Sequence, residues 1–444
     1  MRDLLADLLA QATRKGATAA DAFVVQDQAF SAQVRLGQVD TVKHARDQHV
    51  ALRVFVGQSV AAASTSDLTA EAMTRLVDEA VSLARVTSPD ELAGLPDAAL
   101  LARDIPDLDL HDPHGHDLPP EDKIELARRC EAAALEADPR ITNSEGGDFG
   151  DRRARYAYAT SHGFSGEYRT SSFSLAVSPV AAENGEMQRD SWYHGTRKRA
   201  ALERPEDIGR VAARRTLRRL GARRVKTTEV PVIFDPDMAA SLVRHITGAA
   251  SGPALYRRAS FLVGKLGERI AAPSITVVDN GTIPGALGSR PFDGEGLPVR
   301  RTVVVDRGVL SSYLLDTYSG RKLGLPSTHH AARDGSGVSV STTNLYLAAG
   351  DTDPAEMIRS VKSGLYVTEL IGFGVNGVTG DYSRGAVGLW IENGELAYPV
   401  EEITVAGNLL DMFHAVEAVG NDLVFRDRTA APTVMIGRMT VAGA

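Results

Sequence analysis

Tight turns between alternating apolar runs are the feature that most restricts what this chain can fold into. Asn184-Gly185 and Asn393-Gly394 each join two such runs, and Arg307-Gly308 holds the same position in a third pair. A two-residue turn of this kind is the strongest short-range signal for a β-hairpin, because its residues must tolerate positive φ. Of the 41 glycines, 27 lie beyond residue 226. We therefore predict a mainly antiparallel β domain with few helices over 227–444.

The first half of the chain mixes helical and strand patterns. Apolar residues recur at helical spacing over 2–13, 69–85 and 120–137, whereas 22–64 alternates with a period of two. The predicted fold class is therefore α+β, with antiparallel sheets and helices in the N-terminal region. The predicted parts are an N-terminal α+β subdomain over 1–110, a central α+β subdomain over 111–226 and the β-rich domain over 227–444.

The composition of the chain excludes several classes of function. The formal net charge is −8, and 43% hydrophobic with 24% charged residues is typical of a globular protein. Neither half of the chain has the basic excess of a nucleic-acid-binding domain. No stretch approaches the ~18 apolar residues of a membrane helix. Asp3 and Asp7 interrupt the first apolar pattern, which a signal peptide would not do. We expect a cytoplasmic protein that binds neither nucleic acid nor membrane.

One cysteine and one glycine motif exclude further classes. Cys130 is the single cysteine, which rules out a disulfide framework and a cysteine-based zinc finger within the chain. We interpret it as a buried structural thiol. Residues 372–377 match G-x-G-x-x-G, but the following residues 378–385 cannot begin a stable helix, as a dinucleotide site requires. We interpret this motif as a loop whose glycines adopt positive φ or allow close backbone approach.

The histidines do not form a familiar zinc motif. No histidine is followed by glutamate, so the H-E-x-x-H pattern and its longer variants are absent. His114 and His111 lie in a proline-rich loop, and His329-His330 lies between two turn-like segments. A stand-alone metallopeptidase that uses His111, His114, His329 or His330 as ligands remains an alternative.

The most distinctive stretches of the chain lie beyond residue 250. They contain long polar and glycine-rich runs in a fixed order. The runs are Ser251-Gly252, Tyr256 to Leu262, Leu287 to Pro298, Ser312 to Ser319, Val378 to Ala386, Tyr398 to Thr404 and Met439 to Gly443.

Together these runs resemble the TldD/PmbA family, and specifically its PmbA branch, also called TldE. The resemblance is strong over 227–443 and weaker toward the N-terminus. It implies a cytoplasmic peptidase assembled from two related subunits, TldD and TldE, which acts on unfolded peptides. An older label of the family, modulator of DNA gyrase, implies a second alternative, a regulatory protein that binds gyrase.

The resemblance also implies where a metal site would lie. In the TldD branch a helix carries H-E-x-x-x-H, and a cysteine far downstream completes the site. The equivalent helix here places Arg244 and Ala249 at the two histidine positions and His245 at the glutamate. Arginine is permanently cationic and alanine has no ligand atom. The resemblance therefore implies no metal, no cofactor and no catalytic residue on this chain, with zinc expected on a TldD-like partner.

A glycine-rich loop is the predicted contact region. In the β-rich domain, exposed backbone of the segment Gly380 to Gly385 would be able to pair with an extended peptide. Asp381, Tyr382 and Arg384 are the predicted contacts with the partner subunit or the peptide, and an internal turn network formed by the same residues is the alternative.

The resulting hypothesis is a non-metal-binding, PmbA-like subunit of a heteromeric metallopeptidase. Alone it is expected to be inactive, and whether the chain is itself an enzyme stays open. Its expected partners are a TldD-like subunit and an unfolded peptide. In isolation the chain is expected to be able to form a homodimer, because the two subunit types resemble each other.

Overall fold

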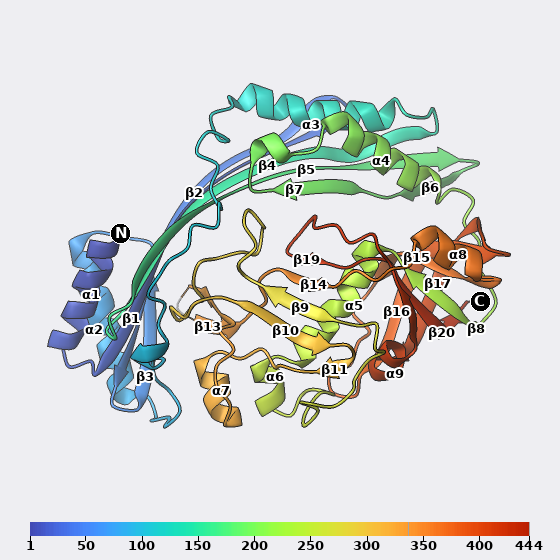
Figure 1. Cartoon of the computed structure of the whole chain (residues 1–444). Coiled ribbons are helices and arrows are strands. Elements are labelled where there is room, and N and C mark those ends of the chain that lie inside the picture. Colours follow the sequence, from blue (N-terminus) through green and yellow to red (C-terminus); the bar gives the residue numbers. More distant parts are fainter. Residues whose placement is uncertain (336, 444) are drawn as a thin grey trace.

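The computed structural model describes residues 1–335 and 337–443, and its fold is α+β as predicted. A long, curved antiparallel sheet, here called the arch, covers one side of a β-rich C-terminal region (Figure 1). The helices of the described residues are α1 (Arg2–Arg14), α2 (Ala70–Val86), α3 (Pro120–Leu135), α4 (Pro205–Leu217), α5 (Pro236–Ala249), α6 (Gly252–Tyr256), α7 (Thr317–Leu323), α8 (Pro354–Ser360) and α9 (Leu409–His414), with short 3-10 turns at Ala98–Leu100 and Arg199–Ala201.

Seven strands form the arch, in the order β3-β2-β1-β4-β5-β6, and β7 pairs with β5. All neighbours are antiparallel. The segment 22–64, in which the alternation predicts several short strands, instead lies within three strands, two of them long. The strands are β1 (Ala19–Arg35), β2 (Gln38–Val56), β3 (Ser59–Thr65), β4 (Ile141–Thr160), β5 (Ser165–Glu183), β6 (Glu186–Arg189) and β7 (Trp192–Thr196).

Helices cover the outer face of the arch in two separate layers (Figure 1). Even-numbered residues of β1 from Ala20 to Val24 pack in one core with α1 and α2. Even-numbered residues from Phe30 to Val34 pack in a second core with α3 and α4. Side chains alternate between the two faces of a strand, so β1 presents one continuous face to both layers. Between the two cores that face carries Gln26 and Gln28, which line a polar hollow.

Two further sheets form most of the C-terminal region. One has the order β11-β10-β9-β14-β19, and the other β17-β16-β15-β8-β20-β18, in which β17 also pairs with β20. Two parallel pairs, β8 with β15 and β14 with β19, interrupt the predicted antiparallel pattern. The strands are β8 (Thr228–Phe234), β9 (Val277–Asn280), β10 (Arg301–Asp306), β11 (Val309–Leu310), β12 (Ala331–Asp334), β13 (Gly337–Val340), β14 (Leu345–Leu347), β15 (Ser363–Ile371), β16 (Asp381–Glu392), β17 (Glu395–Asn408), β18 (Val416–Val419), β19 (Thr429–Ala430) and β20 (Val434–Ala442).

The three predicted hairpin turns are confirmed. Asn184-Gly185 joins β5 to β6, Arg307-Gly308 joins β10 to β11, and Asn393-Gly394 joins β16 to β17. All six turn residues have positive φ. No described helix is long and apolar enough to cross a membrane.

The arch extends across the predicted boundary at residue 110. β1 pairs with β4 from Asp21↔Thr160 to Val34↔Gly147, so residues on both sides of that boundary belong to one sheet. The division of the chain into parts ending at 110 and 226 stays a prediction.

A buried ion cluster joins the arch to the C-terminal region. Asp21 Oδ2 of β1 lies 2.5 Å from Arg53 Nη2 of β2 and 2.7 Å from Arg333 Nη2 of β12. The Asp21 side chain is fully buried, and that of Arg333 is 3% exposed. Burial alone would raise the pKa of Asp21, but the two guanidinium groups outweigh it and hold the pKa below its usual value.

Replacing Asp21 by asparagine is expected to lower the free energy of unfolding by about 3–5 kcal/mol, because two buried cations lose their counter-charge. The matched control is Asp78→Asn, which breaks the solvent-exposed pair with Lys15 and is expected to cost at most about 1 kcal/mol. Urea unfolding followed by circular dichroism measures both changes. Equal losses for the two variants would contradict the role of the cluster.

Candidate functional site

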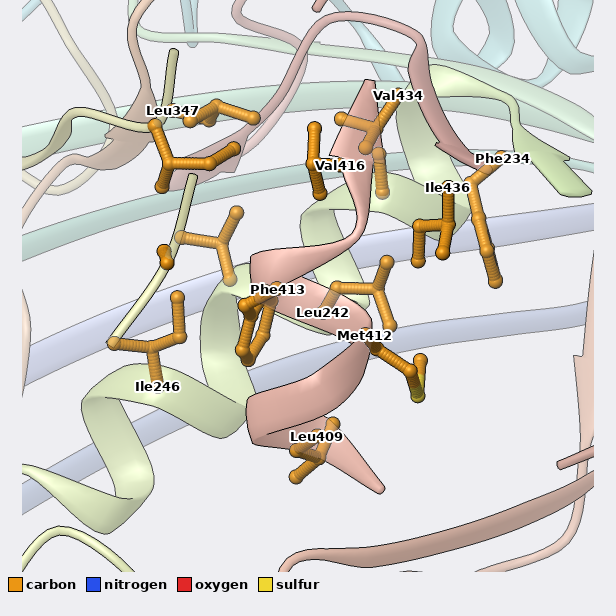
Figure 2. Close-up of a cluster of buried hydrophobic side chains, with 14 of the residues drawn as sticks. Phe234, Leu242, Ile246, Leu347, Leu409, Met412, Phe413, Val416, Val434 and Ile436 are labelled. Carbon is orange, nitrogen blue, oxygen red and sulfur yellow. The ribbon is translucent and has the colours of Figure 1, made fainter. Parts of the chain in front are cut away.

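Helix α5 crosses the core of the C-terminal region. Its first turn is stabilised by Asp235, whose Oδ1 accepts a hydrogen bond of 2.9 Å from the backbone N–H of Met238. Pro236 occupies the first helical position, where no intrahelical N–H is needed. One face of the helix is apolar, and Figure 2 shows Leu242 and Ile246 among side chains from α9, β14 and β20. This packing fixes the direction of the opposite face.

The opposite face of α5 lines a cavity of about 400 Å³, here called the α5 cavity. Arg244, His245 and Ala249, the three positions implied to be a degenerate metal site, all line it. Arg384 of β16 and the loop 372–377 form another part of its wall. The structure therefore brings together residues that lie more than 120 positions apart in the sequence. The full lining is Arg244, His245, Gly248, Ala249, Ala259, Phe261, Gly372, Phe373, Val375, Gly377, Arg384 and Leu409.

His245 and Tyr382 meet edge to face beside this cavity. Their ring centroids are 5.9 Å apart, at an interplanar angle of 80°. His245 Nε2 and the Tyr382 hydroxyl are buried and have no hydrogen-bond partner in the described part of the chain. Burial, Arg384 and Arg244 lower the pKa of His245, so its imidazole is neutral at pH 7. Burial raises the pKa of Tyr382, which keeps its proton.

The segment predicted to be a loop with exposed backbone is instead the first part of strand β16, and its residues 381–385 pair with β17. The predicted contact residues in it have different environments. Tyr382 is 1% exposed, and Arg384 is half-buried with its Nη2 donating a 3.1 Å hydrogen bond to the carbonyl of Leu370. Asp381 is exposed and accepts hydrogen bonds from the Thr379 hydroxyl at 2.6 Å and from Asn408 Nδ2 at 3.4 Å. Asp381 therefore stabilises the turn, while Arg384 lines the cavity. Their contact with a peptide or a partner stays a prediction.

The glycine motif forms the loop between β15 and β16. A Cβ at Gly374 would lie 1.9 Å from the carbonyl oxygen of Ser383, so only glycine fits there. No helix follows the motif, because β16 begins at Asp381. The segment 371–378, which contains this loop, exposes three apolar side chains, at Ile371 (52%), Phe373 (100%) and Val378 (53%). Phe373 was not among the predicted site residues, although an aromatic residue between two glycines in a turn can indicate an exposed apolar contact.

The side chains of the α5 cavity do not fit a zinc ion. Zinc sites use several imidazole, thiolate or carboxylate ligands, and the three positions here offer one imidazole, one permanent cation and one methyl group. Within residues 1–335 and 337–443, no three His, Cys, Asp or Glu side chains converge in a way that would hold a metal. Cys130 is buried on α3, and burial raises its thiol pKa to about 12.

The four alternative ligand histidines have different surroundings. His114 is exposed and 3.4 Å from Asp117 Oδ2. His111 lines a surface hollow on the outer face of the arch. His329 Nδ1 is 2.8 Å from the carbonyl of Pro298, and His330 Nε2 is 3.2 Å from Asp279 Oδ2.

Comparison with known proteins agrees with this architecture. Family models described as PmbA/TldA metallopeptidase domain 1, central domain and C-terminal domain match residues 20–84, 113–220 and 227–443. The chain belongs to the PmbA/TldD metallopeptidase family. It is 41% identical to "Metalloprotease PmbA" of Escherichia coli O157:H7, over 96% of this chain and 92% of that protein.

Two solved structures have the same fold. One, from Bacteroides thetaiotaomicron, is described as a "putative modulator of DNA gyrase"; it has a TM-score of 0.92 and 29% identity, and the match covers 100% of this chain and 98% of that chain. The other is TldE from Thermococcus kodakarensis, with a TM-score of 0.89, 21% identity and coverage of 99% and 100%.

The carboxyl group that caps α5 is expected to make the free energy of unfolding depend on pH. Burial raises the pKa of Asp235 to about 7, although Arg215, with its Nη1 3.7 Å away, opposes the shift. From about pH 4 to pH 7 the folded carboxyl keeps a proton that the unfolded chain has lost, so folding loses stability as pH rises. Asp235→Asn keeps the capping oxygen and cannot titrate. Relative to this variant, the natural chain is expected to lose stability as pH rises from about 4 to about 7.

Urea unfolding of both proteins at pH 5, 6, 7 and 8 measures the difference. A constant difference across this range, or one that favours the natural chain as pH rises, would contradict the raised pKa of Asp235.

Proposed function

We propose that this chain is the subunit without a metal site in a two-subunit metallopeptidase, whose TldD-like partner holds the zinc ion. The observation that carries this proposal is the α5 cavity, in which Arg244 and Ala249 occupy positions where the family resemblance implies zinc ligands. The cavity is built by α5, β16 and the loop between β15 and β16, but their side chains offer no set of zinc ligands. We expect the assembly to act in the cytoplasm on unfolded peptides.

The loop 371–378 is the proposed contact with the partner. It presents Ile371, Phe373 and Val378 to solvent beside the α5 cavity. Clustered exposed apolar side chains are typical of protein–protein contacts, because their burial removes apolar surface from water. Gly374 approaches the backbone of β16 closely, which limits the conformations of the loop. A restrained loop loses less conformational entropy when it binds.

The proposed role of this chain in the reaction is to position the peptide substrate. Neutral His245, protonated Tyr382 and the Arg384 guanidinium provide hydrogen-bonding groups next to the cavity without a titrating base at pH 7. The backbone of residues 381–385 already pairs with β17, so an extended peptide would contact the side chains that line the α5 cavity. A zinc site on the partner would contribute the chemistry, which is activation of water for hydrolysis of the peptide bond.

Peptidase activity is expected only when a TldD-like subunit is present. Each subunit and the reconstituted pair are assayed on a reduced, carboxymethylated and therefore unfolded protein, and metal content is measured by mass spectrometry. The expected result is cleavage by the pair or the partner, none by this chain, and no stoichiometric zinc on this chain. The same preparations give the oligomeric state of the isolated chain.

Two outcomes would overturn the proposal. Stoichiometric zinc together with cleavage by the isolated chain would make it a stand-alone metallopeptidase. Absence of any complex with a TldD-like subunit would remove the proposed partner and favour a different binding role, such as that of a gyrase regulator.

Phe373→Asp is expected to weaken binding of the TldD-like subunit about tenfold or more, because a charge replaces a fully exposed aromatic contact. Val86→Asp is the matched control, since Val86 on α2 is 81% exposed and lies outside the loop. Biolayer interferometry with the partner immobilised measures both affinities. Equal affinities of the two variants would show that the loop does not bind the partner.

A further inference from the structure

A second cavity, of about 770 Å³, lies between the inner face of the arch and the C-terminal region. Figure 1 shows that this face of the arch turns toward β9, β14 and β19. Strands β1, β4, β5 and β7 form one wall, and no helix contributes to the lining. The other wall comes from four segments of the C-terminal region: 287–294, 332–333, 341–342 and 426–428.

The lining of this cavity is rich in arginine, and we call it the arginine cavity. Two acidic residues, Asp293 and Asp427, also line it, and lysine is absent from its lining. The arginines are Arg152, Arg197, Arg290, Arg333, Arg426 and Arg428.

Two of the six arginines have carboxylate partners within the protein. Arg152 Nη2 lies 2.6 Å from Asp27 Oδ2, and Arg333 Nη2 lies 2.7 Å from Asp21 Oδ2. The other four have no carboxylate within ion-pair distance among the side chains that the structure describes. Arg197 instead donates to backbone carbonyls, with its Nη1 3.0 Å from that of Ser171.

Two of these four arginines have buried nitrogens without partners. Arg290 Nε and Nη2 and Arg426 Nε are inaccessible to solvent, and no described residue accepts a hydrogen bond from them. A guanidinium group without a carboxylate partner leaves its positive charge uncompensated, and that charge would attract an anion into the cavity. Arg426 is held in place by its stacking on Trp192, 4.5 Å from the ring centroid.

The positive charges of these arginines affect the pKa values of the same side chains in the cavity. Arg290 and Arg197 both act to lower the pKa of Tyr168, although burial dominates and raises it to about 12. Burial lowers the pKa of Arg197, and the charges of Arg152 and Arg428 act in the same direction. Several positive charges therefore surround one space, where a negative charge would be attracted.

Aromatic rings line the arch side of the same space. Phe23 and Tyr156 stack with centroids 6.3 Å apart, and Tyr156 and Tyr168 stack at 5.0 Å. Phe292 meets Tyr168 edge to face at 5.3 Å. Such a wall packs against apolar or planar groups of a ligand. The ligand that fits both walls is an anion with an apolar or aromatic part.

We propose that the arginine cavity binds the carboxylates of an acidic peptide segment that also carries an apolar or aromatic side chain. The planar guanidinium fork matches a carboxylate with two parallel hydrogen bonds. The same fork also matches phosphate, but phosphate sites commonly add a helix N-terminus, and no helix contributes to this lining. The choice of a peptide as the ligand rests on the proposed function. The inference assigns the binding of acidic segments of the peptide substrate to this subunit.

The test measures binding to the isolated full-length chain, so it does not depend on the partner. The probe is a hexapeptide with two glutamates and one phenylalanine that carries an uncharged methoxycoumarin label, and its counterpart has glutamine in place of both glutamates. Fluorescence anisotropy is expected to show binding of the acidic peptide that is at least about tenfold tighter. Binding is expected to weaken as NaCl is raised from about 50 to 500 mM, because salt screens charge.

Arg290→Gln and Arg426→Gln are each expected to weaken binding of the acidic peptide about tenfold. Arg153→Gln is the matched control, because Arg153 lines the hollow on the outer face of the arch and contacts Gln28. Thermal unfolding checks that each variant folds. The comparison of the two peptides requires no variant, so it stands even if a substitution disturbs folding.

Equal affinity for the acidic and glutamine peptides would overturn the inference, as would unchanged binding in both cavity variants. Displacement of the acidic peptide by inorganic phosphate or ATP at lower concentration than by unlabelled acidic peptide would assign the cavity to phosphate ligands instead. If the peptides do not bind but the reconstituted pair is active, this inference fails while the proposed function stands.

Discussion

The alternation of side chains along β1 determines what lies on each side of the arch. Its even-numbered residues face outward and are covered by two helical layers. Its odd-numbered residues face the C-terminal region, and among them Asp21 is buried between Arg53 and Arg333. A buried carboxylate of this kind must keep its cations, because separating them would expose an uncompensated charge to an apolar interior. This cluster is one of the contacts that hold the C-terminal region, and with it the arginine cavity, against the arch.

Much of the fold could be predicted from local patterns. The turns at Asn184-Gly185 and Asn393-Gly394 are determined by which residues tolerate positive φ, and this constraint acts within a few residues. The length of β1 could not be predicted in the same way. Its polar middle, at Gln26 to Gln28, suggests a break between two strands. The strand in fact continues there, because hydrogen bonds to β2 and β4 extend through it and the side chains face a polar hollow.

Part of the candidate site could be predicted from the sequence, and again contacts between distant segments could not be predicted from local patterns. The convergence of Arg244, His245 and Ala249 with Arg384 was anticipated only through resemblance to a family, since no local pattern connects α5 with β16. The structure adds Phe373, whose exposure depends on how the loop leaves the sheet. The arginine cavity was not predicted at all. Its residues come from several strands and loops, and an arginine in a sequence does not reveal whether a carboxylate faces it in the fold.

Because β1 pairs with β4, the domains that the family models recognise in the sequence do not coincide with units that are expected to fold on their own. The family models for domain 1 and the central domain match 20–84 and 113–220, yet the register from Asp21↔Thr160 to Val34↔Gly147 joins them in a single ladder. An isolated 1–110 fragment would leave one whole edge of β1 without hydrogen bonds, which favours aggregation. We therefore expect the two segments to fold as one cooperative unit, so that loss of either would unfold the whole arch.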